Sequence, residues 1–473
     1  MKSYKIFAIG VVMLPGMASC DNYFDLALDQ NKETKDAFID VQDVKNGMIG
    51  AYYSLGTYRF LGMNVPAIGD MASDLAVASA SSGHYVNINQ YTISDTQQEL
   101  EQVWEYGYKV VDACTRTIKG AQDVLSRGKD LKMSADDSTK VRSYISQCYA
   151  LRALSTFVLT NLYGLPYQAG TDNAQLGISL LDKNPLEPFV KTKRFSVKEC
   201  YDQVLSDIKQ AEEYYEGTGE MNGSPQFYFN DAAIAALKAR VELFMGKYEN
   251  AAADAQKAID LRNSGDVSNE SYVKMWSSIA ITDEDIFTIS KSDNDNLSAN
   301  ALNTLYGSYK GTLSNVLKAK FGKNDIRAQV LRVTAYKFQG TSTSQAVSNI
   351  PIFRKSEMYL IIAECQARLN QQEKAREALL YTAKRNTDIA TVDNLPQDTS
   401  ELLDFIFEER ARELYQEGHR WFDARRMGRT LDVKNGGFKN FDVAKFVFPI
   451  PAAEVNAGFG IIQTTGWEDN LPK

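Results

Sequence analysis

The sequence predicts an all-α fold built from helical pairs that carry long irregular loop insertions. Three observations lead to this prediction. Apolar residues beyond residue 36 recur mainly at helical spacing. Most of the helical stretches come in pairs with short connections, and long polar segments interrupt the pairs. With 473 residues, of which 44% are apolar, the chain is long enough to bury a large core.

The clearest helical pair occupies residues 231–262. Its first helix follows the capping candidate Asn230 and has apolar residues spaced three, four and three apart, at Ile234, Leu237, Val241 and Phe244. A second helix begins directly after Gly246. The turn and second helix match the spacing of the tetratricopeptide consensus at Gly246, Tyr248, Ala251 and Ala258. The sequence therefore predicts tetratricopeptide-like pairs.

Helical spacing also predicts a wider scaffold around this pair. The further helices are expected at about 36–55, 97–126, 139–163, 196–215, 356–369, 372–386, 399–416 and 420–427. We expect one domain over residues 20–473. Its scaffold occupies about 36–262 and 351–427, its ligand-recognition loops about 56–96 and 263–350, and an irregular segment residues 428–473.

The N-terminus predicts export and a lipid anchor. Lys2 and Lys5 precede an apolar run over residues 6–17, which is typical of a signal peptide over residues 1–19. The run is shorter than the roughly 20 residues that span a bilayer. Ala18-Ser19-Cys20 resembles a bacterial lipobox, with Met17 where Leu is usual, so Cys20 is the expected lipidation site. The alternative is an ordinary signal peptide that leaves Cys20 unmodified.

Composition argues against several classes of function. The chain has 52 basic and 60 acidic residues, so its net charge of −8 disfavours nucleic acid as a partner. It has two histidines, His84 and His419, and its remaining cysteines form no C-x-x-C pair. We therefore expect no metal and no cofactor, and we expect buried thiols at Cys114, Cys148, Cys200 and Cys365. The acidic tract 293–296 could hold calcium, but a solvated turn is the favoured interpretation.

A charged helix motif allows two interpretations. Glu409, Glu413 and Glu417 project from one helical face, as the acid and base of a glycoside hydrolase would. Arginines at i+3 and i+4 would instead hold these carboxylates ionised in a structural network. We favour the network, because a catalytic acid needs a raised pKa and neighbouring guanidinium groups lower it.

These features together resemble the SusD/RagB family of outer-membrane nutrient-binding lipoproteins, from the lipobox to the C-terminus. The most specific match is Glu409-Arg410-x-x-Glu413-Leu414-x-x-Glu417-Gly418-x-Arg420-x-x-Asp423-x-x-Arg426. Further matches lie at 161–167, at 354–364, and in the closing segment from Phe448 to Trp467. The closing segment departs from the family at Thr464-Thr465, where Asn-Pro is usual, and at Trp467, where Tyr is usual.

The resemblance implies a protein without enzymatic activity at the cell outer membrane, surface-exposed and lipid-anchored. Its helical half would dock on a SusC-like TonB-dependent transporter. Its loops would hold oligosaccharide against the transporter mouth. Within the same family, peptides are the alternative cargo. Two other readings stay open: an all-α glycoside hydrolase, and a repeat scaffold that binds only proteins.

Sugar rings present flat apolar faces edged by hydroxyl groups, so aromatic side chains beside amides suit their recognition. In the predicted recognition loop 263–350, Asn300 and Asn303 precede Tyr306 and Tyr309 in the sequence. Trp104, Trp276 and Trp421 are expected in the core and Trp467 free. The predicted ligand-binding residues are Tyr85, Asn87, Asn89, Tyr91, Tyr306 and Tyr309.

Overall fold

The computed structural model describes residues 37–181 and 189–472. The described residues from Phe38 onward belong to one compact unit. The predicted signal peptide and Cys20 lie outside the described residues. No described helix is both long enough and apolar enough to span a bilayer.

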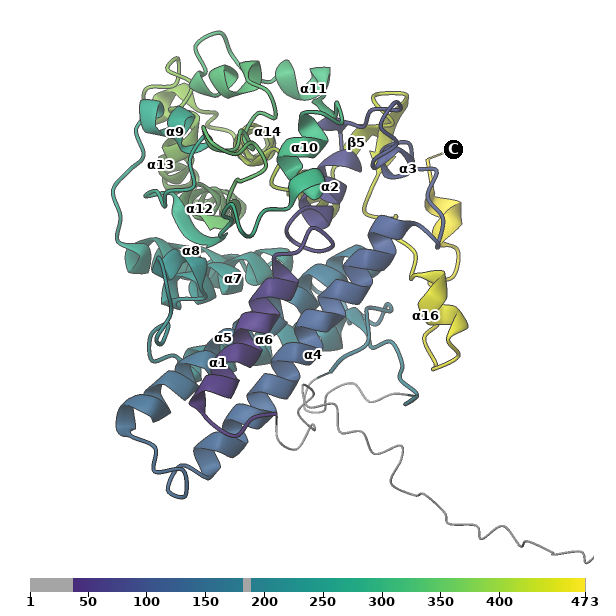
Figure 1. The fold of residues 1–473 in the computed structure, drawn as a ribbon. Helices are drawn as coiled ribbons and strands as arrows, with labels where there is room; N and C mark the ends of the chain where they lie inside the picture. Colours follow the sequence, from purple (N-terminus) through teal and green to yellow (C-terminus); the bar gives the residue numbers. More distant parts are fainter. Residues whose placement is uncertain (1–36, 182–188, 473) are drawn as a thin grey trace, which may run out of the picture. The chain divides into compact units, whose positions relative to one another are not determined.

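Four long helices form one half of the compact unit and run side by side (Figure 1). They are α1 (Val41–Leu55), α4 (Gln98–Ser126), α5 (Ala135–Tyr163) and α6 (Val197–Tyr214). Ser134 starts α5 with a capping box, in which its hydroxyl accepts from Asp137 N and Asp137 in turn accepts from Ser134 N. From residue 143 onward α5 is buried on every face, because α1, α4 and α6 all pack around it.

Two helical pairs continue the scaffold. The first is α7 (Asp231–Phe244) with α8 (Tyr248–Arg262), and the second is α12 (Lys355–Arg368) with α13 (Gln372–Ala383). Gly246 turns the first pair with a φ of +73°, which L side chains rarely adopt. Because α8 packs on α12, the two pairs stack. The predicted all-α fold of tetratricopeptide-like pairs with long insertions is confirmed.

The chain then forms α14 (Thr399–Leu414) and α15 (Arg420–Met427), joined by a turn at Gly418. Helix α2 (Asn64–Met71) lies against this turn, and sequence spacing did not reveal it. A Cβ placed on Gly69 of α2 would lie 2.1 Å from the carbonyl oxygen of Gly418. Two backbones therefore meet here with no room for a side chain.

The insertions contain short elements and two-stranded antiparallel ladders. The pairs are β1 (Ala76–Val77) with β3 (Thr312–Leu313), β2 (Asp285–Ile289) with β4 (Ile350–Arg354), and β5 (Thr430–Val433) with β6 (Phe438–Asp442). Short helices in the same regions are α3 (Val86–Asn89), α9 (Asn269–Met275), α10 (Leu302–Tyr306), α11 (Asn315–Lys318) and α16 (Ala452–Asn456). Most of these short elements could not be predicted from apolar spacing, because they span too few turns to show a helical period.

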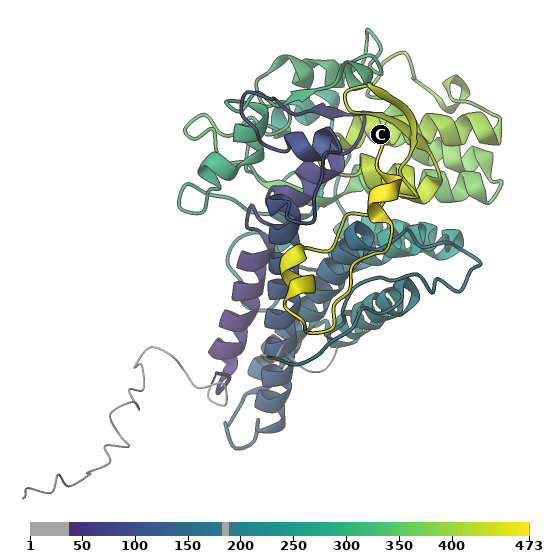
Figure 2. The same ribbon diagram turned by 90° about the vertical axis from the view of Figure 1, so that its right-hand side faces the viewer.

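The C-terminal segment packs along the helical half, as Figure 2 shows in yellow. Phe448 N donates to Leu162 O, and Ala452 N donates to Asp95 O. Trp467 in this segment is buried, so the expectation that it would be free is wrong. Trp104, Trp276 and Trp421 are buried as predicted.

The four predicted thiols are free and buried. Burial raises the pKa of Cys200 to about 11, which keeps its thiol protonated at neutral pH. These cysteines pack as small apolar residues, as predicted.

Candidate functional site

The strand pair β1–β3 brings the two predicted recognition loops together. Ala76 pairs with Leu313, and Val77 pairs with Thr312. Residues 78–96, which include α3, therefore start beside residues 298–311, which include α10 (Figure 1). A third segment, residues 333–338, reaches the same place, because Asn303 Nδ2 donates to Phe338 O at 2.8 Å. We call residues 78–91, 298–311 and 333–338 the rim.

An aromatic pair joins the first two loops of the rim. The rings of His84 and Tyr309 stack with 4.1 Å between centroids and 14° between planes. Both side chains are half-buried. Asn87, three residues after His84, is exposed; its amide donates to Gln97 Oε1 and its oxygen accepts from Thr92 Oγ1. The rim thus offers aromatic surface next to polar groups, which suits a ring with apolar faces and hydroxyl edges.

Four of the six predicted binding residues are buried instead of exposed. Tyr85, Asn89, Tyr91 and Tyr306 are each at most 4% exposed. Their exposure on the rim was predicted wrongly, because distant partners draw the polar ends of three of them inward. Tyr85 Oη donates to Asn64 Oδ1 at 2.6 Å, Asn89 Nδ2 donates to Met71 O and Ala76 O, and Tyr91 Oη donates to Ala72 O. These contacts hold the first loop onto α2.

Asn87 and Tyr309 are the predicted residues that the rim leaves accessible. His84 and Tyr336 join them by position. Tyr336 is half-buried, and its ring lies edge-on to the ring of Tyr306 with 6.3 Å between centroids. Sequence spacing did not indicate Tyr336, because its ring partner Tyr306 lies thirty residues away in the chain.

Backbone strain concentrates at the rim. Tyr85, Tyr91, Lys310, Ala335 and Tyr336 all have φ between +53° and +61°. For residues with a side chain this left-handed conformation costs roughly 1–3 kcal/mol each, and it persists only where surrounding contacts enforce it. Such strain gathers at sites where loop geometry serves binding.

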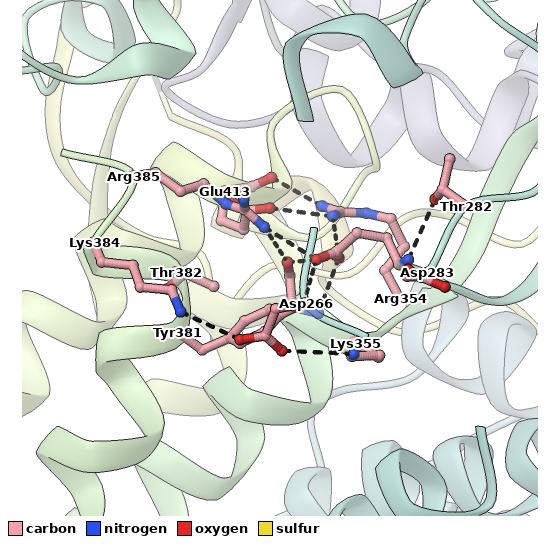
Figure 3. A network of polar contacts seen from close by, with 12 residues as sticks. Asp266, Thr282, Asp283, Arg354, Lys355, Tyr381, Thr382, Lys384, Arg385 and Glu413 are labelled. Carbon is pink, nitrogen blue, oxygen red and sulfur yellow. Dashed lines mark hydrogen bonds and ion pairs between the residues drawn. The ribbon is translucent and has the colours of Figure 1, made fainter. Parts of the chain in front are cut away.

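A buried charge network holds one strained segment of the rim, through Lys337. It is centred on Glu413 of α14, whose carboxylate lies 3.0 Å from Arg385 Nε, 3.1 Å from Arg354 Nη1 and 3.3 Å from Arg327 Nη1. Figure 3 shows Glu413 between Arg354 and Arg385, with Asp266 between Lys355 and Lys384 nearby. Burial by itself would raise the pKa of Glu413, but the three arginines outweigh burial and lower it to about 2.

Glu409 and Glu417 belong to the same network. Glu409 pairs with Arg327 at 2.7 Å, and Glu417 pairs with Arg354 at 2.8 Å. Burial opposes ionisation of Glu417, but Arg354 and Lys337 lower its pKa to about 2. A carboxyl group that stays ionised cannot serve as a general acid near neutral pH, so the favoured structural interpretation of this motif is supported.

The predicted source of the arginines is mostly wrong. Arg412 pairs with Glu409 at i+3, as helical spacing suggested. The other cations come from distant parts of the chain, at Arg327, Lys337, Arg354 and Arg385. The network joins α14 to the irregular half of the molecule as well as joining helices to each other.

Two branches of the network hold rim segments. Lys337 donates from Nζ to Glu417 Oε1 and to Glu413 O at 2.6 Å each, directly after the strained residues Ala335 and Tyr336. Arg420 of α15 forms a two-pronged pair with Asp74 at 2.8 and 2.9 Å, just before β1. The family-like motif therefore fixes the rim without forming part of its surface.

The predicted calcium alternative finds little geometric support. Asp295 lies 3.1 Å from Lys291 Nζ, and Asn296 Nδ2 bonds to Asp293 O within the same turn. Across residues 37–181 and 189–472, no group of three or more His, Cys, Asp or Glu side chains is placed to hold a metal ion.

The model of the SusD family matches residues 287–467, and a related model, described as starch-binding associating with outer membrane, matches residues 22–243. The chain is a member of the SusD/RagB family.

Two curated relatives come from Formosa agariphila. SusD-like protein P38 is 22% identical over 95% of this chain and 97% of its own length. SusD-like protein P2 is 25% identical, and the match covers 57% of this chain and half of that relative.

Solved structures share the fold. A putative sugar-binding protein from Bacteroides vulgatus has a TM-score of 0.77 at 23% identity, covering 91% of this chain and 99% of its own. A SusD superfamily protein from Bacteroides thetaiotaomicron has a TM-score of 0.76 at 23% identity, covering 90% and 99%. At these identities the comparison shows the fold alone.

Proposed function

We propose that the protein is a surface-exposed lipoprotein that captures oligosaccharide and delivers it to a SusC-like TonB-dependent outer-membrane transporter. The observation that carries this proposal is the rim, where residues 78–91 and 298–311 meet at the His84–Tyr309 stack and residues 333–338 join them at Asn303. Two findings support it: the family model described as starch-binding and outer-membrane-associated, and the solved relative described as sugar-binding.

The energetics suit reversible capture. Covering about 100 Å² of apolar ring surface contributes about 2.5 kcal/mol, whereas a micromolar complex needs about 8 kcal/mol. One ring is insufficient for this binding free energy. The rings of Tyr309 and Tyr336, together with hydrogen bonds from Asn87, would supply it. The protein needs no chemical step for this role, only binding and release.

The test is a binding screen with a matched pair of variants. Isothermal titration calorimetry with a panel of neutral oligosaccharides should find a ligand whose affinity falls in Tyr309→Ala and is unchanged in Tyr53→Ala. Tyr53 is a highly exposed tyrosine of α1 outside the rim. If neither the wild-type protein nor Tyr53→Ala bound any oligosaccharide of the panel, the glycan assignment would be refuted.

Peptide cargo is the second candidate, favoured by one observation. All four tryptophans are buried, so the rim has no indole platform of the kind that sugars favour. A peptide panel in the same calorimeter decides between them. Peptide binding that Tyr309→Ala weakens, without oligosaccharide binding, would replace sugar with peptide and keep the transport role.

The anchor and the transporter partner complete the proposal. A diacylglyceryl group and an N-acyl chain at Cys20 would bury many methylene groups at about 0.8 kcal/mol each, which suffices for stable anchoring. Radiolabelled palmitate should enter the wild-type protein and not Cys20→Ser. The transporter should co-purify with the tagged wild-type protein from outer membranes, and its absence would contradict the proposed partnership.

A further inference from the structure

The stacked helical pairs form a groove remote from the rim. Its volume is about 520 Å³, within the range of about 300–1,000 Å³ typical of ligand sites. In Figure 1 α12 lies between α13 and α8, and the rim helix α10 is drawn further to the right. Solenoid-like stacking commonly generates such concave surfaces.

Three helices each contribute one stripe of side chains to the groove. Helix α12 supplies the central stripe, in which successive residues are three and four positions apart, so that all share one face. The stripes are Tyr359, Ile362 and Gln366 from α12; Glu249, Ala252, Ala253 and Gln256 from α8; and Lys374, Glu377 and Ala378 from α13.

The groove floor combines an aromatic ring with small side chains. One face of the Tyr359 ring stacks on Tyr381, with 4.0 Å between centroids and 16° between planes, which fixes the ring's orientation. Ala252 and Ala378 extend the floor without protruding. A flat apolar floor of this kind matches the face of a sugar ring better than a branched side chain, which needs a deep pocket.

The groove also contains hydrogen-bonding groups without partners in the described part of the chain. Gln366 Oε1 is buried and accepts no hydrogen bond there. The side chains of Glu249, Lys374 and Glu377 form no ion pair with any other described residue, although oppositely charged groups share the groove. A buried amide oxygen without a donor costs free energy, which a hydroxyl group of a ligand would recover.

The charges of the groove nearly balance, with two carboxylates and one ammonium group among the lining side chains. This favours a neutral ligand over a strongly charged one. The groove has helices on every side and no strand edge, so an extended peptide would find no main-chain ladder to join. A chain of neutral hydroxyl-bearing rings fits both features.

We infer that this groove is a second binding site for neutral oligosaccharide, separate from the rim. The inference rests on the proposed glycan-capturing function and extends it. Tyr359 provides the stacking surface, Gln366 Oε1 accepts from a sugar hydroxyl, and Glu249, Glu377 and Lys374 bond the outer hydroxyl groups. Two sites on one molecule would let a long glycan bind at both places and raise its apparent affinity.

The test fills the groove with a side chain placed on an exposed position. Ala253→Trp puts an indole into the groove, and Lys257→Trp is its control on the same helix outside the groove. Calorimetry uses neutral oligosaccharides, malto-oligosaccharides among them, with residues 38–473, which form one compact unit. In a Tyr309→Ala background the remaining binding should weaken at least about tenfold in Ala253→Trp and persist in Lys257→Trp.

A second variant guards against misfolding of the first. Glu377→Ala removes a wall carboxylate at an exposed site and should weaken the same residual binding with an unchanged unfolding transition. If oligosaccharide bound one-to-one, and this binding were abolished in Tyr309→Ala but intact in Ala253→Trp, the proposal of a second site in the groove would be wrong. The proposed function of the rim would stand. Absence of all oligosaccharide binding would overturn both proposals, and peptide binding lost in Ala253→Trp would overturn the glycan class.

Discussion

The buried charge network and the rim differ in how their side chains are held. In the network, each carboxylate of Glu409, Glu413 and Glu417 has cationic partners and is almost excluded from water. On the rim, His84 and Tyr309 are half-buried, Asn87 is exposed, and strained backbone carries several of their neighbours. The tightly held side chains therefore lie below the rim, while the rim surface keeps polar and aromatic groups accessible.

Breaking the network should have the largest effect. Glu413→Ala leaves Arg327, Arg354 and Arg385 without their shared carboxylate, and removing one partner of a buried ion pair costs about 3–5 kcal/mol. Urea denaturation would measure this loss. The exposed pair Asp404–Arg429 is the control, since Asp404→Ala should cost at most about 1 kcal/mol. Equal losses in the two variants would show that the network does not dominate stability.

Replacing tyrosines above and below the rim surface should separate stability from affinity. Tyr85→Ala removes a buried ring and its bond to Asn64, so we expect a loss of about 3–5 kcal/mol in unfolding free energy. Tyr309→Ala should instead weaken oligosaccharide binding by about 2 kcal/mol with a smaller loss of stability. If Tyr309→Ala destabilised the protein as much as Tyr85→Ala, the ring would belong to the core.

The boundary between the two regions should show a pH dependence. Asp70 of α2 is fully buried, and burial raises its pKa to about 8, which Lys337 only partly opposes. Because the folded-state pKa exceeds the unfolded value of about 3.9, Asp70 contributes stability below about pH 4 that is lost as pH rises towards 8. The unfolding free energy, measured by denaturation at several pH values in this window, should fall with pH by at most about 1.4 kcal/mol per unit because of Asp70. Asp70→Asn should remove this contribution. An unchanged slope would mean that Asp70 is already ionised.

Relief of backbone strain should give the smallest effect. Lys310 is exposed at φ +59°, so Lys310→Gly should be more stable than Lys310→Ala by about 1 kcal/mol. At Lys119, an exposed position inside α4, the order should reverse, with Ala about 1 kcal/mol more stable than Gly. Thermal denaturation of the four variants measures both differences. The same order at both positions would show that the rim backbone is not strained at Lys310.

Sequence spacing predicted the scaffold better than the rim. Long helices such as α4 and α5 can be predicted because their apolar periodicity extends over many turns. Helix α2 has eight residues and is buried on all faces, so it shows no amphipathic pattern. The structure brings parts of the two predicted recognition loops together at β1 and β3, a proximity that sequence spacing did not predict. Which of their tyrosines point outward depends on Asn64, Met71 and Ala72, and these partners become visible only when α2 is in place.

The partners in the buried charge network could likewise be predicted only in part from sequence spacing. Spacing within α14 correctly indicated that its glutamates face one way and are held ionised. It could not indicate that Arg327 and Arg354 supply the charge, because they lie more than fifty residues from Glu413 in the chain and come close only in the folded molecule. Local rules find pairs at i+3 and i+4, and long-range pairs need the tertiary structure.

The ladder between β1 and β3 joins the loops of the rim through just two residue pairs. Such a small seam constrains little of the sequence on either side of it. The accessible positions His84, Asn87 and Tyr309 can therefore change with little cost to folding, whereas Tyr85, Asn89 and Tyr91 between them are anchored on α2 and its C-terminal end.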